Sequence, residues 1–267
     1  MSANPVHVAR VGNADQALMI HCALARHEAL LPLANALGGA TLFDMPGHGL
    51  SVDWDGKTEY QGLVADIAIS LCDGPTHLIG HSFGATAALR LAVIRPDLVS
   101  RLTLIEPVYF AAAKGTEAHR AHARVFRPFV MAMLAGDEEK AAQVFNDLWG
   151  ETAWADLSER RRADLTNRIH LIVAGAAAIE EDADGITSAE RLAELRMPVT
   201  MVRGSETQDV IVAIHEVLAS RLPDVTDRVV PGAGHMLPLT HTEQVADIIR
   251  AAGSENRQPY PLSPTNP

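Results

Sequence analysis

Short apolar runs alternate along this chain with longer segments in which apolar residues recur at helical spacing. The runs predict strands at Val6–Val11, Ala17–His21, Gly39–Phe43, Thr76–Ile79, Leu102–Ile105, Val199–Arg203 and Thr226–Val230. The helical patterns predict helices at Glu28–Leu37, Glu59–Cys72, Ala85–Ile94, Val210–Ser220 and Glu243–Ala251. Because strands that alternate with helices form parallel sheets, we predict an α/β protein whose mostly parallel central sheet is flanked by helices.

The alternation stops between Pro107 and Pro198. This interval is rich in Ala, Arg and Glu, has helical patterns throughout and contains no convincing strand. We therefore divide the chain into a sheet-bearing core at residues 1–106 and 198–252 and a helical insertion at residues 107–197. Residues 253–267 contain four prolines and several polar residues, which indicates a flexible tail.

Composition and charge narrow the classes of partner. The 267 residues suit one large domain, and the formal net charge of −11 disfavours nucleic acid and anionic membranes. No apolar run approaches the roughly 20 residues of a membrane span, and residues 1–10 lack the apolar core of a signal peptide. Cys22 and Cys72 lie far apart in apolar stretches, as in a cytoplasmic protein with reduced thiols. We expect a cytoplasmic protein that acts on a small molecule, and exposed apolar residues on a helix of the insertion would suit a homodimer.

The most informative motif joins a predicted strand to a predicted helix: Gly80-His81-Ser82-Phe83-Gly84. A serine at such a junction is held in a strained conformation that exposes its hydroxyl above the sheet. The flanking glycines fit this geometry because side chains there would clash where strand and helix approach each other. Ser82 is therefore the candidate nucleophile.

A serine hydroxyl is a weak nucleophile and needs a base within hydrogen-bond reach. His235 is the candidate base, because it lies on a glycine-rich loop after the last predicted strand, at the sheet edge where Ser82 is expected. An oxyanion hole needs two backbone N–H groups aimed at the developing charge. We expect one from Phe83, at a helix N-terminus, and the other from Ala23, in the loop after Ala17–His21.

Four segments in this order resemble the α/β-hydrolase fold superfamily: Met19-Ile20-His21 with its loop, Asp44 to Ser51, the Ser82 turn, and Gly234-His235. The resemblance covers roughly residues 6–252 and implies a Ser-His-acid triad that cleaves ester, amide, lactone, epoxide or C–C bonds. It identifies the insertion with the cap that many members carry over the active site, and it gives His48 an architectural role. Ser82 argues against the dehalogenases and epoxide hydrolases of this fold, which generally have aspartate there.

The acid of the triad departs from the family pattern. The resemblance places it at Thr207, after the strand Val199–Arg203, but a threonine carries no charge to stabilise an imidazolium. Three carboxylates are alternatives: Glu106, Asp209 and Glu206. We favour Glu106, because it ends an apolar strand, where a carboxylate is costly to bury without a partner. A purely structural role for Glu106 and a dyad without an acid stay open.

Cys22 is a second departure, because the family usually has glycine after the histidine of the oxyanion loop. A side chain there could reshape the hole, but no base or positive cluster marks Cys22 as a nucleophile. His119 and His122 stand at i and i+3 with no third ligand nearby, so we expect them on a solvated helix face. We expect no metal and no cofactor.

These residues predict a serine hydrolase that cleaves a small carboxylic ester or lactone through an acyl-enzyme. Apolar residues in the insertion indicate an apolar acyl or alcohol group. Two alternatives stay open: a non-hydrolytic, ligand-binding member of the fold, and a C–C bond hydrolase or cofactor-free oxygenase.

Overall fold

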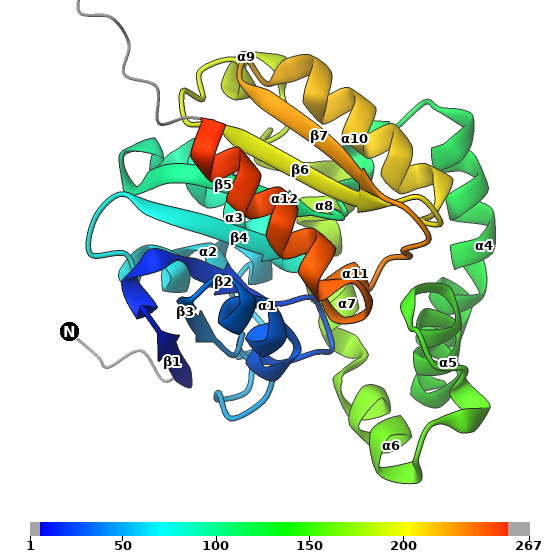
Figure 1. Cartoon of the computed structure of the whole chain (residues 1–267). Helices are drawn as coiled ribbons and strands as arrows, with labels where there is room; N and C mark the ends of the chain where they lie inside the picture. Colours follow the sequence, from blue (N-terminus) through cyan, green and yellow to red (C-terminus); the bar gives the residue numbers. More distant parts are fainter. Residues whose placement is uncertain (1–5, 256–267) are drawn as a thin grey trace, which may run out of the picture.

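The computed structural model describes residues 6–255, and within them a sheet of seven strands forms the centre of the molecule (Figure 1). The strands are β1 (Val8–Gly12), β2 (Leu18–Ile20), β3 (Gly39–Phe43), β4 (Thr76–His81), β5 (Val99–Ile105), β6 (Val199–Gly204) and β7 (Val225–Val230). Their order is β1-β3-β2-β4-β5-β6-β7; β1 pairs antiparallel with β3, and the other neighbours are parallel. The predicted mostly parallel sheet is confirmed.

Apolar side chains leave the sheet in both directions, which explains why its strands are apolar runs. Leu18 and Ile20 pack into a core with α2 (Tyr60–Ser70) and α3 (Phe83–Ile94). Met19, between them, packs into a second core with α1 (Leu31–Ala36) and α12 (Thr242–Glu255). In Figure 1, α1 and α12 lie on the near face of the sheet. The helices around the sheet are α1 (Leu31–Ala36), α2 (Tyr60–Ser70), α3 (Phe83–Ile94), α10 (Asp209–Arg221), α11 (Leu237–Thr240) and α12 (Thr242–Glu255), with short 3₁₀ turns η1 (Ala14–Gln16), η2 (His27–Leu30) and η3 (Pro96–Leu98).

Between β5 and β6 the chain forms helices, as predicted for this interval. They are η4 (Phe110–Ala113), α4 (Glu117–Leu134), α5 (Glu138–Trp149), η5 (Trp154–Asp156), α6 (Glu159–Arg168), α7 (His170–Ala174), α8 (Ala176–Glu181) and α9 (Ala189–Leu192). Figure 1 shows α4, α5 and α6 standing beside the sheet rather than against its faces. Phe129 of α4, Ala141 of α5 and Leu165 of α6 share a separate apolar cluster, so these helices have a packing core of their own.

The C-terminal helix is longer than predicted, because α12 continues through Glu255. The predicted tail therefore begins no earlier than residue 256, and residues 256–267 lie outside the described part of the chain. Among the helices of residues 6–255, none combines the length and apolar character needed to cross a bilayer.

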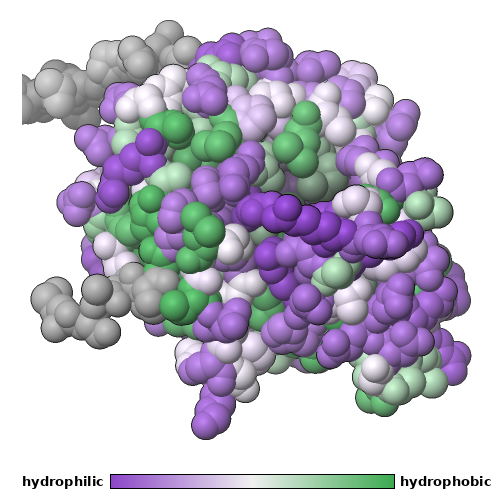
Figure 2. All heavy atoms as spheres, turned by 90° about the horizontal axis from the view of Figure 1, so that it is seen from below, coloured by the Kyte–Doolittle hydropathy of each residue, from purple (hydrophilic) through white to green (hydrophobic). Residues whose placement is uncertain are grey.

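The surface carries several apolar side chains. Figure 2 shows hydrophobic patches among hydrophilic residues on the face seen from below. The most exposed include Leu134, at the end of α4, which is 78% exposed, and Leu50, which is 73% exposed. Association into a homodimer stays a prediction.

The carboxyl ends of four neighbouring strands carry the candidate chemistry. Ser82 follows β4 and Glu106 follows β5, whereas Thr207 and His235 lie in the segments that follow β6 and β7. Because these strands are parallel neighbours in the sheet, the four residues gather at one edge.

Candidate active site

Ser82 occupies a strained turn between β4 and α3. Its backbone has φ 56° and ψ −118°, in a region that favours glycine. A Cβ at Gly84 would lie 2.2 Å from the Ile20 carbonyl oxygen, and one at Gly80 would lie 2.4 Å from the Gly84 carbonyl oxygen. Both glycines are therefore required by backbone contact, as the sequence predicted.

Ser82, His235 and Glu106 form a continuous hydrogen-bonded chain. Ser82 Oγ lies 3.0 Å from His235 Nε2, and His235 Nδ1 lies 3.0 Å from Glu106 Oε2. Ser82 and Glu106 are buried, at 7% and 0% exposed, and His235 is partly buried, with a side chain that is 9% exposed. The geometry can support proton transfer from the serine hydroxyl to the imidazole.

Glu106 is held as a carboxylate by hydrogen-bond donors. The Gly204 N–H donates to Oε1 at 2.8 Å, and the Thr207 hydroxyl donates to Oε2 at 2.5 Å. Burial alone would raise the pKa of Glu106, but the bond from His235, with those from Thr207 and Gly204, brings the pKa below its ordinary value. An ionised carboxylate only accepts, so Nδ1 of His235 carries the proton and Nε2 accepts from Ser82.

The other two candidate acids lie away from this chain. Glu206 and Asp209 are both exposed to solvent, and neither has a hydrogen bond to His235 within residues 6–255. Glu206 is held by its backbone N–H, which donates to the Ala233 carbonyl oxygen at 2.9 Å, and Asp209 begins α10. Only Glu106 among the three carboxylates contacts the imidazole.

Two residues that the sequence did not single out hold His235 in place. His81 Nε2–H donates to the His235 carbonyl oxygen at 2.9 Å, and burial, with the neighbouring His235, lowers the pKa of His81 to about 3. Trp149 of α5 packs edge-to-face against the His235 ring, with 4.7 Å between the two ring centroids. The sequence signal for His81 was its position next to the nucleophile. Trp149 stood among the apolar residues of the insertion, but its contact with His235 depends on how α5 packs.

The two expected oxyanion donors are free of other partners. Within residues 6–255 no hydrogen bond engages the N–H of Ala23 or of Phe83. The following N–H, of Leu24, donates instead to Nε2 of His48 at 3.0 Å, and Leu24 has a φ of 58°. His48 is buried and its Nδ1–H donates to the Pro46 carbonyl oxygen at 3.1 Å. His48 thus fixes the loop that carries Ala23.

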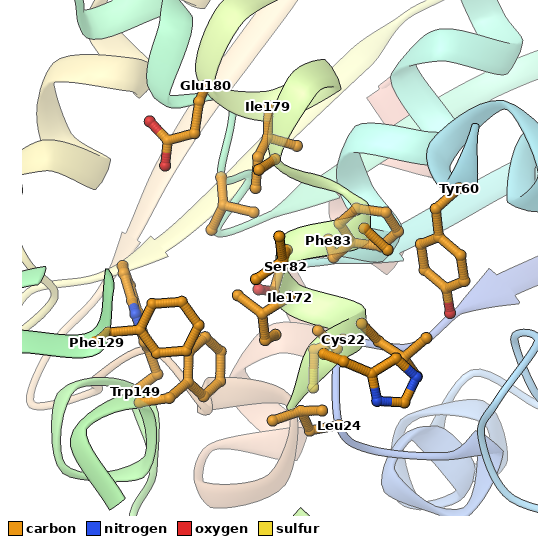
Figure 3. Close-up of a pocket in the computed structure, with 18 of the residues that line it drawn as sticks. Cys22, Leu24, Tyr60, Ser82, Phe83, Phe129, Trp149, Ile172, Ile179 and Glu180 are labelled. Atoms are coloured by element: carbon orange, nitrogen blue, oxygen red, sulfur yellow. The ribbon is translucent and has the colours of Figure 1, made fainter. Parts of the chain in front are cut away.

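Cys22 is a buried thiol beside the candidate nucleophile. Burial raises the pKa of Cys22 to about 12, so the sulfur stays protonated at neutral pH. The residue lines the same cavity as Ser82 (Figure 3). A protonated thiol without a base is not a competing nucleophile.

A cavity of about 1070 Å³ lies over Ser82 and His235. Helices between β5 and β6 supply much of its apolar wall, including Phe126, Phe129, Phe145, Trp149, Leu171 and Ile179. Figure 3 shows Ser82 among these side chains, with Phe129 and Trp149 on one side and Phe83 and Tyr60 on the other. Glu180 of α8 also lines the cavity.

The expectation of a solvated helix face was wrong for His122. His122 is 6% exposed and stacks on Phe110 at 4.5 Å. Burial lowers the pKa of His122 to about 4. The ring lies in the wall of the cavity because α4 turns this face toward Phe110 and Trp149.

A model of the alpha/beta hydrolase family matches residues 17–248. The chain belongs to this family. The match spans the strands β2 to β7 and every residue of the hydrogen-bonded chain.

Two curated relatives carry the names of an esterase and a hydrolase. The chain is 30% identical over 220 residues to a pimeloyl-[acyl-carrier protein] methyl ester esterase of Methylococcus capsulatus, covering 78% of this chain and 82% of that protein. It is 26% identical to an (E)-2-((N-methylformamido)methylene)succinate hydrolase of Acinetobacter baylyi, covering 78% and 77% of the two chains. These relatives and the family support a hydrolase activity for the chain.

Solved structures share the fold. A thermophilic esterase from Thermogutta terrifontis superposes with a TM-score of 0.71 at 21% identity, covering 95% of this chain and 96% of that one. MenH from S. aureus gives a TM-score of 0.70 at 16% identity, covering 94% and 99%. At these identities the likeness concerns the fold alone.

Proposed function

We propose that this protein is a serine hydrolase that cleaves a carboxylic ester or lactone with an apolar acyl or alcohol group. The observation that carries the proposal is the buried chain from Ser82 Oγ through the His235 ring to Glu106, with 3.0 Å at each step, at the wall of an apolar cavity. Within that chain the hydrogen bonds to Glu106 lower its pKa and keep it ionised, as the acid of acyl transfer must be.

In the first half-reaction Ser82 Oγ attacks the substrate carbonyl carbon while Nε2 of His235 takes the hydroxyl proton. The imidazolium that forms is stabilised by Glu106, which stays ionised because its hydrogen bonds lower its pKa. The tetrahedral intermediate collapses, and His235 returns the proton to the leaving alcohol. Water then attacks the carbonyl carbon of the acyl-enzyme while Nε2 of His235 takes its proton. His235 returns this proton to Ser82 Oγ as the carboxylic acid leaves.

The N–H groups of Phe83 and Ala23 would stabilise the oxyanion. Phe83 begins α3, so the positive end of the helix dipole adds to its N–H. The loop of Ala23 is held by His48 through Leu24. Preorganised donors of this kind contribute more to the rate than donors that must reorient during the reaction.

Residues 107–197 would act as the cap that selects the substrate, because their helices supply most of the apolar cavity wall. An apolar acyl chain gains free energy from burial there. Thr207 at the usual acid position and Cys22 in the oxyanion loop kept a non-hydrolytic protein open, and the bond from Thr207 to Glu106 supports the hydrolase.

The test uses a fluorophosphonate probe and p-nitrophenyl esters of increasing acyl length. The wild type should be labelled and turn over the esters, preferring octanoate to acetate, whereas Ser82→Ala should lose both reactions. Ser220→Ala is the matched control, because Ser220 is a serine of α10 away from the cavity and should behave as wild type. A folded wild type that is neither labelled nor active would overturn the proposal.

A further inference from the structure

Two histidines and an aspartate converge outside the cavity. His27 Nδ1 lies 2.9 Å from Asp44 Oδ1, and His7 Nδ1 lies 3.3 Å from Asp44 Oδ2. One ligand atom from each of the three residues lies within 4.8 Å of the others. None of the three lines the cavity over Ser82. The sequence did not reveal this group, because its members come from three separate segments without a known spacing.

The nitrogen of His7 is unsatisfied in this cluster. His7 Nδ1 is buried and has no hydrogen-bond partner within residues 6–255, although a carboxylate lies close to it. Buried polar atoms in proteins are normally hydrogen-bonded or coordinated. An unpartnered imidazole nitrogen beside a fully buried carboxylate therefore points to a missing ligand.

The backbone holds His7 and Asp44 together without help from their side chains. The Asp44 N–H donates to the His7 carbonyl oxygen at 3.0 Å. The His7 N–H donates to Ser51 Oγ at 2.9 Å, and that hydroxyl donates to the Asp44 carbonyl oxygen at 2.6 Å. His27 is tied to the same carboxylate by its own N–H, at 2.8 Å. The cluster is thus preorganised.

The donor set and its spacing suit a tetrahedral metal ion. Bonds of about 2.0–2.1 Å from Zn²⁺ to nitrogen and oxygen place tetrahedral ligand atoms roughly 3.4 Å apart. The separations of 3.3 Å from His7 Nδ1 to Asp44 Oδ2 and 2.9 Å from His27 Nδ1 to Asp44 Oδ1 lie within about half an ångström of that value, and the carboxylate can bind through either oxygen. Glu28 Oε2 lies 3.2 Å from His27 Nδ1 and can supply a fourth ligand. Two carboxylates would balance the charge of a dication.

We propose that His7, His27 and Asp44, completed by Glu28, bind a divalent transition-metal ion, with Zn²⁺ as the best fit. Binding needs the lone pair of His27 Nδ1, so the ring proton that faces Asp44 leaves Nδ1 and Nε2 carries a proton in the bound state, which keeps the imidazole neutral. The ion joins the segment before β1, the end of β3 and the loop after β2. That loop also carries Ala23 and Leu24, so the role of the ion is to stabilise the oxyanion loop. Metal binding itself does not require the proposed hydrolase activity, so the two can be tested separately.

The test is calorimetric titration of Zn²⁺ into the whole protein after treatment with EDTA and dialysis. We expect one equivalent to bind, a higher melting temperature on saturation, and the visible spectrum of a tetrahedral site when Co²⁺ replaces Zn²⁺. His7→Ala and His27→Ala should each weaken binding at least tenfold and abolish the thermal shift. His241→Ala, which changes a histidine outside the cluster, should bind as wild type does.

Native mass spectrometry of the wild type gives a second readout that does not depend on the variants. It should show a mass increase of one ion per chain. The proposal is overturned if the wild type shows no saturable binding, or if folded His7→Ala and His27→Ala proteins bind as tightly as the wild type. Fluorophosphonate labelling of the same samples reports the hydrolase separately, so the two proposals can fail independently.

Discussion

The Thr207 hydroxyl donates a hydrogen bond of 2.5 Å to Oε2 of Glu106, the oxygen that also accepts from His235. Thr207 stands after β6, where the family pattern has its acid, whereas Glu106 follows the neighbouring strand β5. Two adjacent strands thus lead to one point beside the imidazole. The carboxylate that contacts His235 thus follows β5, and a threonine of the segment after β6 donates to it.

This relationship predicts that a carboxylate at position 207 can take over the role of Glu106. Glu106→Ala should lower kcat by about 10⁴-fold, the fall seen when the triad acid of a serine protease is replaced. Adding Thr207→Asp to Glu106→Ala should raise kcat at least tenfold. The Thr207 side chain already contacts Glu106, so the new carboxylate lies close to the position that the lost one occupied. Steady-state kinetics with a p-nitrophenyl ester measures both steps.

Asp209→Asn is the matched control, since Asp209 is an exposed carboxylate after the same strand. It should keep wild-type kinetics. Full activity in Glu106→Ala together with loss in Asp209→Asn would show that the acid lies elsewhere.

Glu180 predicts a pH dependence of stability. Burial raises the pKa of Glu180 to about 7; Glu181 adds to this, and Lys114 opposes it. Between the ordinary value of 4.5 and about 7 the folded protein therefore binds more protons than the unfolded chain, so stability falls as the pH rises through this window. Glu180→Gln removes this effect. As the pH rises from 4 to 8, the free energy of unfolding of the variant should increase by about 1–3 kcal/mol relative to that of the wild type.

Urea unfolding of both proteins across this pH range measures the difference. The KM of the wild type for an apolar ester should also rise above pH 7, where Glu180 in the cavity wall becomes charged. If the free energies of unfolding of the two proteins change with pH in the same way, the raised pKa of Glu180 is contradicted.

Cys22 should be dispensable for the chemistry. Its thiol is protonated at neutral pH because burial raises the pKa to about 12. We expect iodoacetamide to leave the activity intact at pH 7, and Cys22→Ala to retain kcat within roughly threefold, because only cavity shape changes. Peptide mapping after alkylation should find Cys72, which is partly exposed, modified before Cys22. Inactivation that tracks alkylation of Cys22 would contradict this.

The sequence predicted the features that depend on neighbours along the chain. The apolar runs located each strand to within a few residues, and Gly80 and Gly84 meet the close contacts expected of them. The acid could not be decided in the same way. Its choice depends on Glu106 adopting a φ of 50° after β5, which turns the side chain toward the loop of β7. The apolar strand before Glu106 favoured it over Asp209, but no local signal predicted the positive φ on which its contact with His235 depends.

Helix faces within the insertion show the same limit. The pair His119 and His122 looked like a polar face, yet His122 packs against Phe110 of η4 and Trp149 of α5. Those partners are separated from it along the chain and approach only when α4 and α5 pack together. Tertiary contact decides whether a histidine at helical spacing is solvated or buried.

His48 should act as a positioning residue for the oxyanion loop. Its Nε2 accepts the Leu24 N–H at 3.0 Å, and burial, with His21 nearby, lowers the pKa of His48 to about 3, so it remains a neutral acceptor at neutral pH. His48→Ala leaves that N–H unpaired, which costs about 1–3 kcal/mol of stability and frees the loop. The Ala23 N–H then loses its fixed direction, and kcat should fall about 10–100-fold with little change in KM.

His48→Gln separates the two effects, because a side-chain oxygen can again accept from Leu24. It should recover part of the lost kcat, whereas a variant that merely fills the space, His48→Leu, should not. Kinetics and melting temperatures measured on all three proteins decide the matter. If His48→Ala lowers the melting temperature but leaves kcat unchanged, the loop does not need this bond to present its N–H, and Ala23 loses its support as an oxyanion donor.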